Sequence, residues 1–336
     1  MNKTLLIGLC LWSLVSTGAA APLQLTDMTG RTVVLSAPAK RLVTTYMPAT
    51  IFTLSLGLQD QLVGISNQDQ RQSLVKGLLA GRSPVQVGSR SAGINLETII
   101  GLKPDLVLIN DKKDGARLAE QLQQLGIAAL LIKAESLEQV QQAMDLIAKA
   151  TGHQAQALRY QQLSGQLIDE LTRKLASTTP VRGYYGNGGD LYRSVNAQMY
   201  QHQLLELAGI TNVAADVPGF YPKINLEQLL RWQPEMLVLE QGKNGRLAQQ
   251  LNATELAYLS KLPRVTLPSG ALWHMPSPVA VAGAYYLASQ VHPQQFNDTD
   301  VSAVVADFYQ QLLGQACLSP LPDTKDPATG APCKHD

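Results

Sequence analysis

Two pairs of neighbouring side chains have the chemistry to bind a metal complex. Tyr46 and Met47 follow an apolar run that predicts a strand, and Trp273 and His274 lie together in a loop just before Pro276. A phenol or an imidazole can coordinate iron, stack on a flat chelate or form a hydrogen bond to it. These four residues are candidate ligand contacts. A core position for Tyr46 is the alternative, and the sequence leaves open whether Tyr46 or His274 coordinates a metal.

Three cations extend the set of candidate contacts. Arg90, Lys112 and Arg193 carry charges that pair with carboxylate, catecholate or oxyanion groups. In the alternative interpretation, each of them is a solvated surface cation. The aromatic residues Tyr192, Phe220 and Tyr221 flank loops of the second half and are candidate wall residues. The hypothesis requires a fold that brings these side chains to one place.

The apolar runs of the chain predict parallel strands, and the edge of such a sheet is where these side chains would meet. The runs 106–109 and 236–239 each follow a helical stretch, which is typical of parallel strands that are covered on both faces. Ligands of such sheets bind beyond the carboxyl ends of the strands. The remaining candidates follow predicted strands: Asn110, Tyr185, Asn187 and Gln241. The glycine-rich run 186–189 would let backbone N–H groups approach a ligand, or would form an ordinary surface turn.

An internal repeat organises the chain. Ile94-Asn95-Leu96-Glu97 recurs as Ile224-Asn225-Leu226-Glu227, and the match continues through Pro104 and Pro234 into the two apolar runs. Each copy predicts a helix capped by asparagine, a turn marked by proline and a buried strand. The sequence therefore predicts an α/β fold of two similar lobes, each with a central parallel sheet and with a ligand cleft between them.

A long helical stretch connects the two copies. Residues 153–176 have apolar side chains at spacings of three and four, and Gly152 separates them from the helix before. One stiff helix joining two lobes resists a wide hinge, so we expect the lobes to move little when a ligand binds. The predicted segments are a first lobe at 22–150, a linking helix at 151–177, a second lobe at 178–314 and a proline-rich tail at 315–336.

The first residues have the pattern of a secretory signal. A short positive start precedes an apolar run of about twelve residues, and small residues follow up to Ala21. We expect residues 1–21 to be removed on export to the periplasm. Cys317 and Cys333 then remain as a pair, and an oxidising compartment favours a disulfide between them.

Composition narrows the classes of function. Of 336 residues, 45% are hydrophobic and 16% charged, and 27 basic residues balance 26 acidic ones. No run of like charge appears, so nucleic acid is not an expected partner. The sequence also lacks the nucleophile elbow, the phosphate-binding loop and the paired zinc histidines of common enzymes. We expect a monomeric binding protein with no enzymatic activity and no intrinsic cofactor.

The chain resembles a known family, the substrate-binding proteins of ABC importers for iron chelates, haem, cobalamin and related metal compounds. The resemblance covers residues 25 to about 313. It is carried by an opening hairpin at 25–31, by Val87-Gly88 through Asn95-Leu96-Glu97, by Lys103-Pro104-Asp105-Leu106-Val107 and by the region 273–278. It implies two lobes joined by a helical backbone, and delivery of the ligand to an inner-membrane permease with its ATPase.

Candidate ligands follow from the side chains on offer. A siderophore-type iron complex needs converging cations and aromatic walls, and the sequence has both, so an iron chelate is the expectation. Haem, cobalamin and a metal oxyanion such as molybdate are alternatives. An alternative function is that of a periplasmic metal-storage or sensor protein that works without a permease.

The resemblance also implies an exposed acid on each lobe that docks with the permease. Asp60 and Asp69 are the only acids between Ile51 and Leu96. We expect Asp69 to serve the first lobe. The candidates for the second lobe are Glu206 and Asp216.

Overall fold

The computed structural model describes residues 21–89, 92–112, 114–240, 250, 257–316 and 319–321. Residues 1–20 of the predicted signal, the two cysteines of the predicted disulfide (Cys317 and Cys333) and the candidate contacts Arg90 and Gln241 lie outside the described residues. No helix in the described part of the chain has the length and apolar character needed to cross a membrane.

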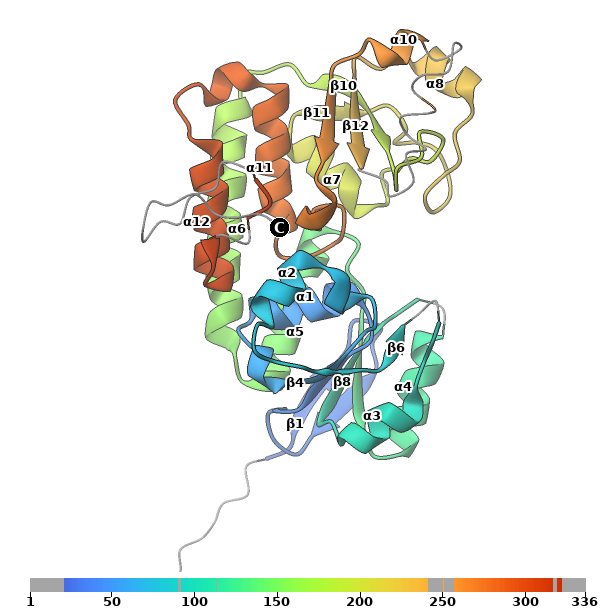
Figure 1. Ribbon diagram of the computed structural model, residues 1–336, viewed down its shortest axis with the longest axis vertical. Coiled ribbons are helices and arrows are strands. Elements are labelled where there is room, and N and C mark those ends of the chain that lie inside the picture. The colour runs from blue at the N-terminus through green and yellow to red at the C-terminus, as the bar shows by residue number, and fades with distance from the viewer. Residues whose placement is uncertain are drawn as a thin grey trace, which may run out of the picture.

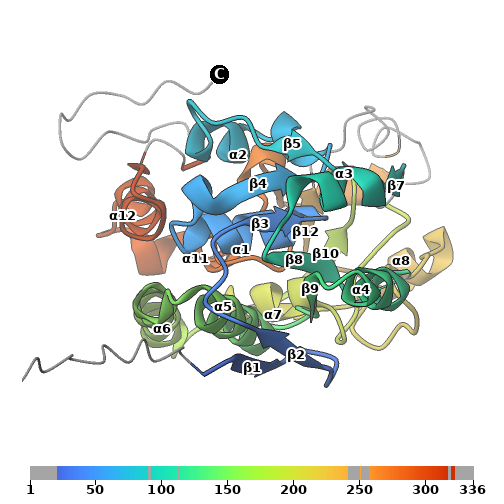
Figure 2. The ribbon, with the colours of Figure 1, turned by 90° about the horizontal axis from the view of Figure 1, so that it is seen from below.

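The first lobe contains a five-stranded parallel sheet (Figure 1). In spatial order its strands are β5 (Val85–Gln86), β4 (Leu62–Ile65), β3 (Leu42–Thr44), β8 (Leu106–Asn110) and β9 (Ala128–Ile132). One face of this sheet is covered by three helices, α1 (Met47–Ser55), α2 (Ser73–Leu78) and α5 (Leu137–Thr151). The other face is covered by α3 (Leu96–Leu102) and α4 (Gly115–Gln124). Short elements complete the lobe: η1 (Gln59–Gln61), η2 (Asp69–Arg71), β6 (Gly88–Ser89) and β7 (Gly93–Ile94). An antiparallel hairpin, β1 (Leu23–Thr26) and β2 (Thr32–Leu35), lies beside α5 and β9 (Figure 2).

The second lobe contains a four-stranded parallel sheet. Its spatial order is β11 (Ile210–Asn212), β10 (Val181–Gly186), β12 (Met236–Glu240) and β13 (Arg264–Leu267). Its other elements are α7 (Tyr200–Leu207), α8 (Leu226–Trp232), α10 (Ala257–Ser260), η4 (Ser269–Ala271), α11 (Ala280–Val291), η5 (Pro293–Phe296) and α12 (Val301–Leu313). The long helix α6 (Gln154–Leu175) rises from the first lobe and packs against α11 and α12 of the second (Figure 1). The α/β fold with parallel sheets is therefore as predicted.

The repeat folds twice into the same unit of helix, turn and strand. Asn95 and Asn225 cap α3 and α8, each accepting a hydrogen bond from the backbone N–H three residues later. The helices end at Lys103 and Gln233, which adopt left-handed backbone conformations with φ of 46° and 45°. A proline follows each of them and leads into β8 or β12. The predicted unit is confirmed in both halves of the chain.

One hydrophobic core is shared by the two lobes. In β8, Leu106 and Leu108 face this core, whereas Val107 and Ile109 face a smaller cluster under α3 and α4. In β12, side chains alternate in the same way. One set faces the shared core, and the other set faces a smaller cluster that lies within the second lobe. Each sheet thus contributes one face to the shared core, which explains why both strands are apolar without interruption.

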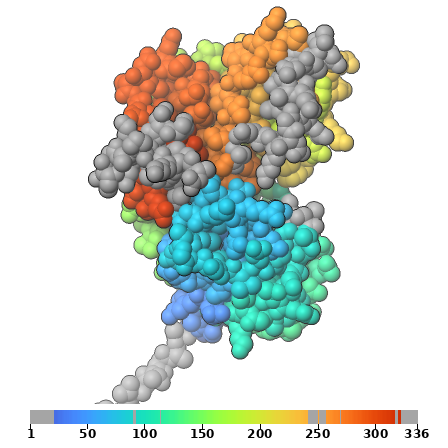
Figure 3. Space-filling view, viewed as in Figure 1, coloured from blue at the N-terminus to red at the C-terminus, as the bar shows by residue number. Residues whose placement is uncertain are grey.

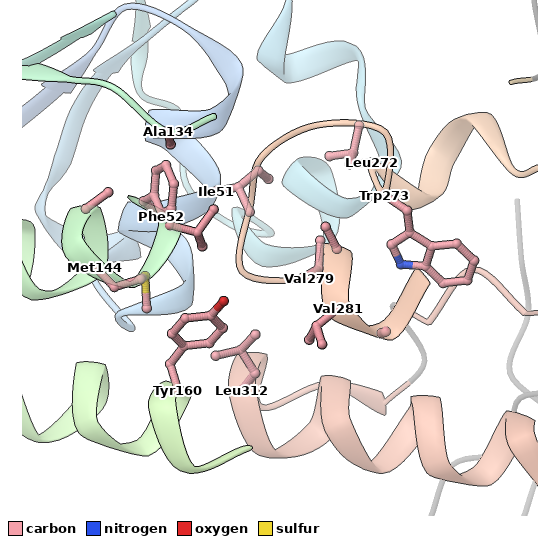
Figure 4. Packing of buried hydrophobic residues seen from close by; sticks show 14 of the residues in the cluster. Ile51, Phe52, Ala134, Met144, Tyr160, Leu272, Trp273, Val279, Val281 and Leu312 are labelled. Carbon is pink, nitrogen blue, oxygen red and sulfur yellow. The ribbon is translucent and has the colours of Figure 1, made fainter. Parts of the chain in front are cut away.

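The shared core crosses from one lobe to the other at four helices. Ile51 and Phe52 of α1 belong to the same buried cluster as Tyr160 of α6, Val281 of α11 and Leu312 of α12 (Figure 4). The lobes are also in contact in the space-filling view (Figure 3). Opening them widely would expose apolar surface at a cost of roughly 25 cal/mol per Å². Packing therefore opposes a wide hinge, in addition to the stiffness of α6.

A polar contact ties the lobes at the edge of this core. The backbone N–H of Leu137, at the start of α5, donates to Oε1 of Gln203 on α7 at 2.8 Å. Elsewhere at the junction, η4 packs against α2, and a Cβ added at Gly270 would lie 3.3 Å from Oγ of Ser73. Both contacts hold second-lobe segments against first-lobe helices.

We expect the two lobes to unfold together, and α6 offers a matched pair of substitutions to test this. Leu171 is 0% exposed and Leu158 is 54% exposed on the same helix. Leu171→Ala should lower the unfolding free energy by about 2–5 kcal/mol, because it leaves a cavity in a core that both lobes share. Leu158→Ala should change it by roughly 0.5 kcal/mol or less. Scanning calorimetry measures both, and two separate transitions in the native protein would contradict a shared core.

Candidate functional site

A cavity of about 320 Å³ lies between the lobes, at the carboxyl edge of the first sheet. First-lobe residues supply most of its lining: Thr45, Tyr46, Met47, Pro48, Ser66, Gln68, Asp69, Ser89, Asn110, Lys112, Ala134 and Glu135. From the second lobe come Gln201, Phe220, Tyr221, Met275 and Pro276. A larger hollow of about 670 Å³ beside the β1–β2 hairpin contains none of the candidate contacts.

Four of the predicted contacts meet in this cavity: Tyr46, Met47, Asn110 and Lys112. They meet because β3 and β8 are adjacent parallel strands, so the residues that follow them lie at one edge of the sheet. Tyr46 is the residue before α1, and its extended backbone turns the chain from β3 into that helix. Oδ1 of Asn110 accepts a hydrogen bond from the backbone N–H of Lys112 at 3.1 Å, which orders the turn after β8.

Lys112 connects the two walls of the cavity. Its Nζ forms an ion pair with the carboxylate of Glu135 in the first lobe. The same Nζ lies 4.0 Å from the centroid of the Phe220 ring in the second lobe. A partly exposed cation–π contact of this kind contributes about 0.5–1 kcal/mol. Among the described residues that line the cavity, Lys112 is the one cation, and Glu135 already balances its charge.

Asp69 is a buried acid in the wall of the cavity. Its side chain is 0% exposed, and its Oδ2 accepts a hydrogen bond of 2.5 Å from Oγ1 of Thr50. Burial raises the pKa of Asp69 to about 6, although the hydrogen bond from Thr50 acts in the opposite direction. The prediction that Asp69 docks with a permease is wrong, because its side chain is buried in the wall of the cavity and does not lie on the outer surface of the lobe.

Tyr185 and Asn187 do not line the cavity, contrary to expectation. The hydroxyl of Tyr185 donates to Oε1 of Glu240 at 2.7 Å, and the backbone N–H of Gly188 donates to Oε2 at 2.7 Å. The glycine-rich turn therefore binds a carboxylate of its own lobe. Asn187 lies in the same turn, where its backbone N–H donates to the carbonyl of Arg193.

Arg193 is also separate from the cavity. It forms an isolated antiparallel bridge with Lys223, and its exposed side chain lines a different hollow, together with Asp190 and Tyr192. The expected convergence of cations is therefore not found among the described residues. Sequence reasoning chose Arg193 for its charge, and the structure places it in a hollow that residues of its own lobe line.

Trp273 is a core residue rather than a ligand contact. It is 1% exposed, and its Nε1–H donates to the hydroxyl of Tyr309 at 3.2 Å. Its ring lies against Gly283 of α11, where an added Cβ would come within 2.6 Å of the indole. The missing side chain at Gly283 makes room for the indole inside the shared core. The ring also contacts that of Tyr286.

His274 is half-buried and stands next to the cavity, but only the two residues after it, Met275 and Pro276, line it. Its carbonyl accepts a hydrogen bond from Nε2 of Gln201 at 2.8 Å. Burial lowers the pKa of His274, and the charge of Glu240 offsets this only in part. The imidazole is therefore neutral at neutral pH.

Sequence reasoning missed several residues of the cleft. Gln201 donates to Oη of Tyr221 at 3.0 Å as well as to His274, so it fixes one wall. It lies on α7, far along the chain from any strand end, and its sequence context carries no signal for this role. Glu240 does not line the cavity, but its support of the glycine-rich turn was missed too, although a charged residue that ends the apolar run of β12 is a usable signal.

The two acids expected to dock from the second lobe are exposed. Glu206 on α7 pairs with Nε2 of His202 one turn away at 3.3 Å, and Asp216 lies in the loop after β11. Their role in docking stays a prediction. Within the described residues, no group of three or more His, Cys, Asp or Glu side chains is placed to hold a metal ion.

Two lobes with parallel sheets, a joining helix and a cavity at the junction define a two-lobed substrate-binding protein. The family model described as periplasmic binding protein matches residues 43–261. The chain therefore belongs to the periplasmic binding protein family, whose members are substrate-binding components of ABC importers and not enzymes.

Individual relatives differ in what their names say they bind. A vitamin B12-binding protein of Pectobacterium atrosepticum is 31% identical over 216 residues, which cover 62% of this chain and 74% of the relative. A molybdate-binding protein of Haemophilus influenzae is 25% identical over 344 residues, with 92% and 96% covered. Among solved structures, the Helicobacter pylori protein CeuE, in complex with Ni-His, has a TM-score of 0.74 at 20% identity and covers 87% of this chain and 96% of its own.

The raised pKa of Asp69 predicts a pH-dependent effect on stability. The pKa rises from the ordinary 3.8 to about 6 on folding, so the folded state is favoured by protonation and loses stability as pH rises through this range. Asp69→Asn cannot ionise. The variant should gain on the order of 1–3 kcal/mol of unfolding free energy at pH 7.5, and this gain should vanish below about pH 4. Urea unfolding at the two pH values measures it, and an equal difference at both would contradict the assignment.

Proposed function

We propose that this protein captures a siderophore-type iron chelate in the cavity between its lobes and delivers it to an inner-membrane ABC permease. The observation that carries the proposal is the composition of the cavity wall. Among the described lining residues, the aromatic rings of Tyr46, Tyr221 and Phe220 stand beside amide side chains and one cation, which is already paired. Such a wall suits the organic shell of a chelate, which offers both apolar surface and hydrogen-bonding groups.

The charges of the wall favour a chelate that is close to neutral. Glu135 balances Lys112, and Asp69 adds a carboxyl group. A ferric tricatecholate complex is strongly anionic and would meet no unpaired cation among the described lining residues. A ferric trihydroxamate complex is neutral at its metal centre and avoids this repulsion. Hydroxamate-type complexes are therefore the preferred class within the proposal.

The size of the cavity supports a ligand of moderate dimensions. About 320 Å³ is at the lower end of the roughly 300–1,000 Å³ that is usual for ligand pockets. A corrinoid is much larger than this space, and most of it would remain outside the cavity. A chelate with part of its shell in the open mouth of the cleft fits better.

A metal oxyanion is the second candidate. The observation in its favour is that the molybdate-binding relative from Haemophilus influenzae covers 92% of this chain. Against it stand the carboxyl groups of Asp69 and Glu135 in the wall, because sites for bare oxyanions are built from hydrogen-bond donors.

Docking with the permease is proposed to use exposed acids. Asp60 replaces Asp69 as the first-lobe candidate, since its side chain is 74% exposed beside Arg82. Glu206 and Asp216 remain the candidates of the second lobe. Charges of this kind at the rim of an interface act mainly on the rate of association.

A panel of ligands tests the proposal. Native mass spectrometry of protein purified from the periplasm should reveal an iron-bearing adduct, and titration calorimetry should give submicromolar affinity for a ferric trihydroxamate. Haem, cobalamin, nickel–histidine, a ferric tricatecholate and molybdate should each bind at least tenfold more weakly. Tight binding of molybdate or cobalamin, with none of any iron chelate, would contradict the proposal.

Single substitutions map the site. Tyr46→Ala should weaken binding of the ferric trihydroxamate at least tenfold, because Tyr46 lines the cavity. Tyr258→Ala is the matched control, since Tyr258 is an exposed tyrosine of α10 and should leave the affinity unchanged. Equal effects of the two variants in calorimetric titrations would place the ligand elsewhere.

Two cations allow a second comparison. Lys112→Met should weaken binding of the same complex, since it removes the contact with Phe220 across the cavity and leaves Glu135 without its partner. Arg193→Met should have no effect, because Arg193 lines a separate hollow. A larger effect of the Arg193 variant would contradict the map of the site.

A further inference from the structure

One oxygen atom in the wall of the cavity has a hydrogen-bonding capacity that the fold does not use. Asp69 begins η2, where its backbone N–H donates to the carbonyl of Ser66 at 3.0 Å. Its side chain is 0% exposed. The carboxyl Oδ1 has no hydrogen-bond partner in the described part of the chain.

The other carboxyl oxygen is fixed by a chain of two hydroxyl groups. Oγ1 of Thr50 donates to Oδ2 of Asp69, and Oγ1 of Thr50 lies 2.6 Å from Oγ1 of Thr44. Because Thr50 gives its proton to Asp69, Thr44 is the donor in the second bond. Neither threonine lines the cavity, whereas Asp69 does. Oδ1 is therefore the oxygen that remains for a ligand.

An unpaired buried oxygen of this kind needs an explanation. Buried polar atoms in folded proteins are paired with few exceptions, and an exception often marks a functional site or a partner that is absent. No ion pair to Asp69 is found among the described residues, and Lys112, the cation among the described lining residues, is paired with Glu135. Burial raises the pKa of Asp69 to about 6, so at pH 7.5 the group is ionised and can only accept hydrogen bonds.

We propose that Oδ1 of Asp69 is a ligand contact that accepts a hydrogen bond from an N–H or O–H donor on the bound chelate. The contact makes Asp69 a determinant of specificity: it favours complexes whose organic shell carries a donor and disfavours ligands that offer only acceptors, such as bare oxyanions. This inference rests on the proposed function, because it assumes that the ligand lies in the cavity between the lobes.

The substitution Asp69→Asn reverses the chemistry of this atom with little change in shape. The amide oxygen can still accept the hydrogen bond from Thr50, which turns the amide N–H₂ group toward the position of Oδ1. An acceptor at the cavity wall thus becomes a donor. Asp60→Asn is the matched control, because Asp60 is an exposed acid of the same lobe that does not line the cavity.

Calorimetric titration at pH 7.5 with two probes tests the inference. The ferric complex of desferrioxamine B carries amide N–H groups and an ammonium group, whereas molybdate offers only acceptor oxygens. Asp69→Asn should lose at least tenfold in affinity for the ferric complex and should bind molybdate more tightly than the native protein does. Asp60→Asn should match the native protein with both probes, and thermal unfolding should verify that both variants are folded.

The outcomes separate the inference from the proposed function. If the native protein and folded Asp69→Asn bind the ferric complex with equal affinity, the inference is overturned while the proposed function stands. If the ferric complex does not bind the native protein at all, both the proposed function and the inference that rests on it are overturned. A loss of affinity for the ferric complex and for molybdate alike would also overturn the inference, because it would show damage to the site instead of a change of preference.

Discussion

Packing of α1 and α5 of the first lobe against α6, α11 and α12 is the constraint on which the rest of the structure depends. These helices bury one continuous hydrophobic cluster, to which each sheet also contributes one face. The cluster fixes the two sheets relative to each other and so fixes the cavity between them. Separation of the lobes would expose this apolar surface to water, and the polar contact of Leu137 with Gln203 would break as well. The cleft is therefore largely formed before a ligand arrives.

The two lobes have the same architecture, but they contribute unequally to the lining of the cavity. Asn110 ends β8, and its counterpart in the repeat is Glu240 at the end of β12. Asn110 lines the cavity, whereas Glu240 accepts hydrogen bonds from Tyr185 and Gly188 and holds the glycine-rich turn of its own lobe. The second lobe instead reaches the cavity with α7 and with the loops at 220–221 and 275–276. The polar part of the site thus belongs mainly to the first lobe.

Local patterns in the sequence were sufficient for the framework and for part of the site. The caps at Asn95 and Asn225, the proline turns and the apolar strands depend on residues close together in the chain, and all were predicted. The rule for strand ends predicted that Tyr46 and Asn110 lie close together, and they line one cavity because their strands are neighbours in one sheet. Burial depends on contacts distant in sequence, and here prediction failed. Nothing local reveals that Gly283 makes room for the indole of Trp273, or that the carboxyl group of Asp69 is buried.

Small-angle X-ray scattering, with and without a bound ferric trihydroxamate, tests the central claim most directly. The claim is that the shared core holds the lobes in place, so that the ligand enters a cleft that is already formed. The account predicts that the radius of gyration and the scattering profile stay nearly unchanged when calorimetry shows the site to be saturated. A marked compaction on saturation would mean that the lobes close by a wide hinge, and would contradict the account.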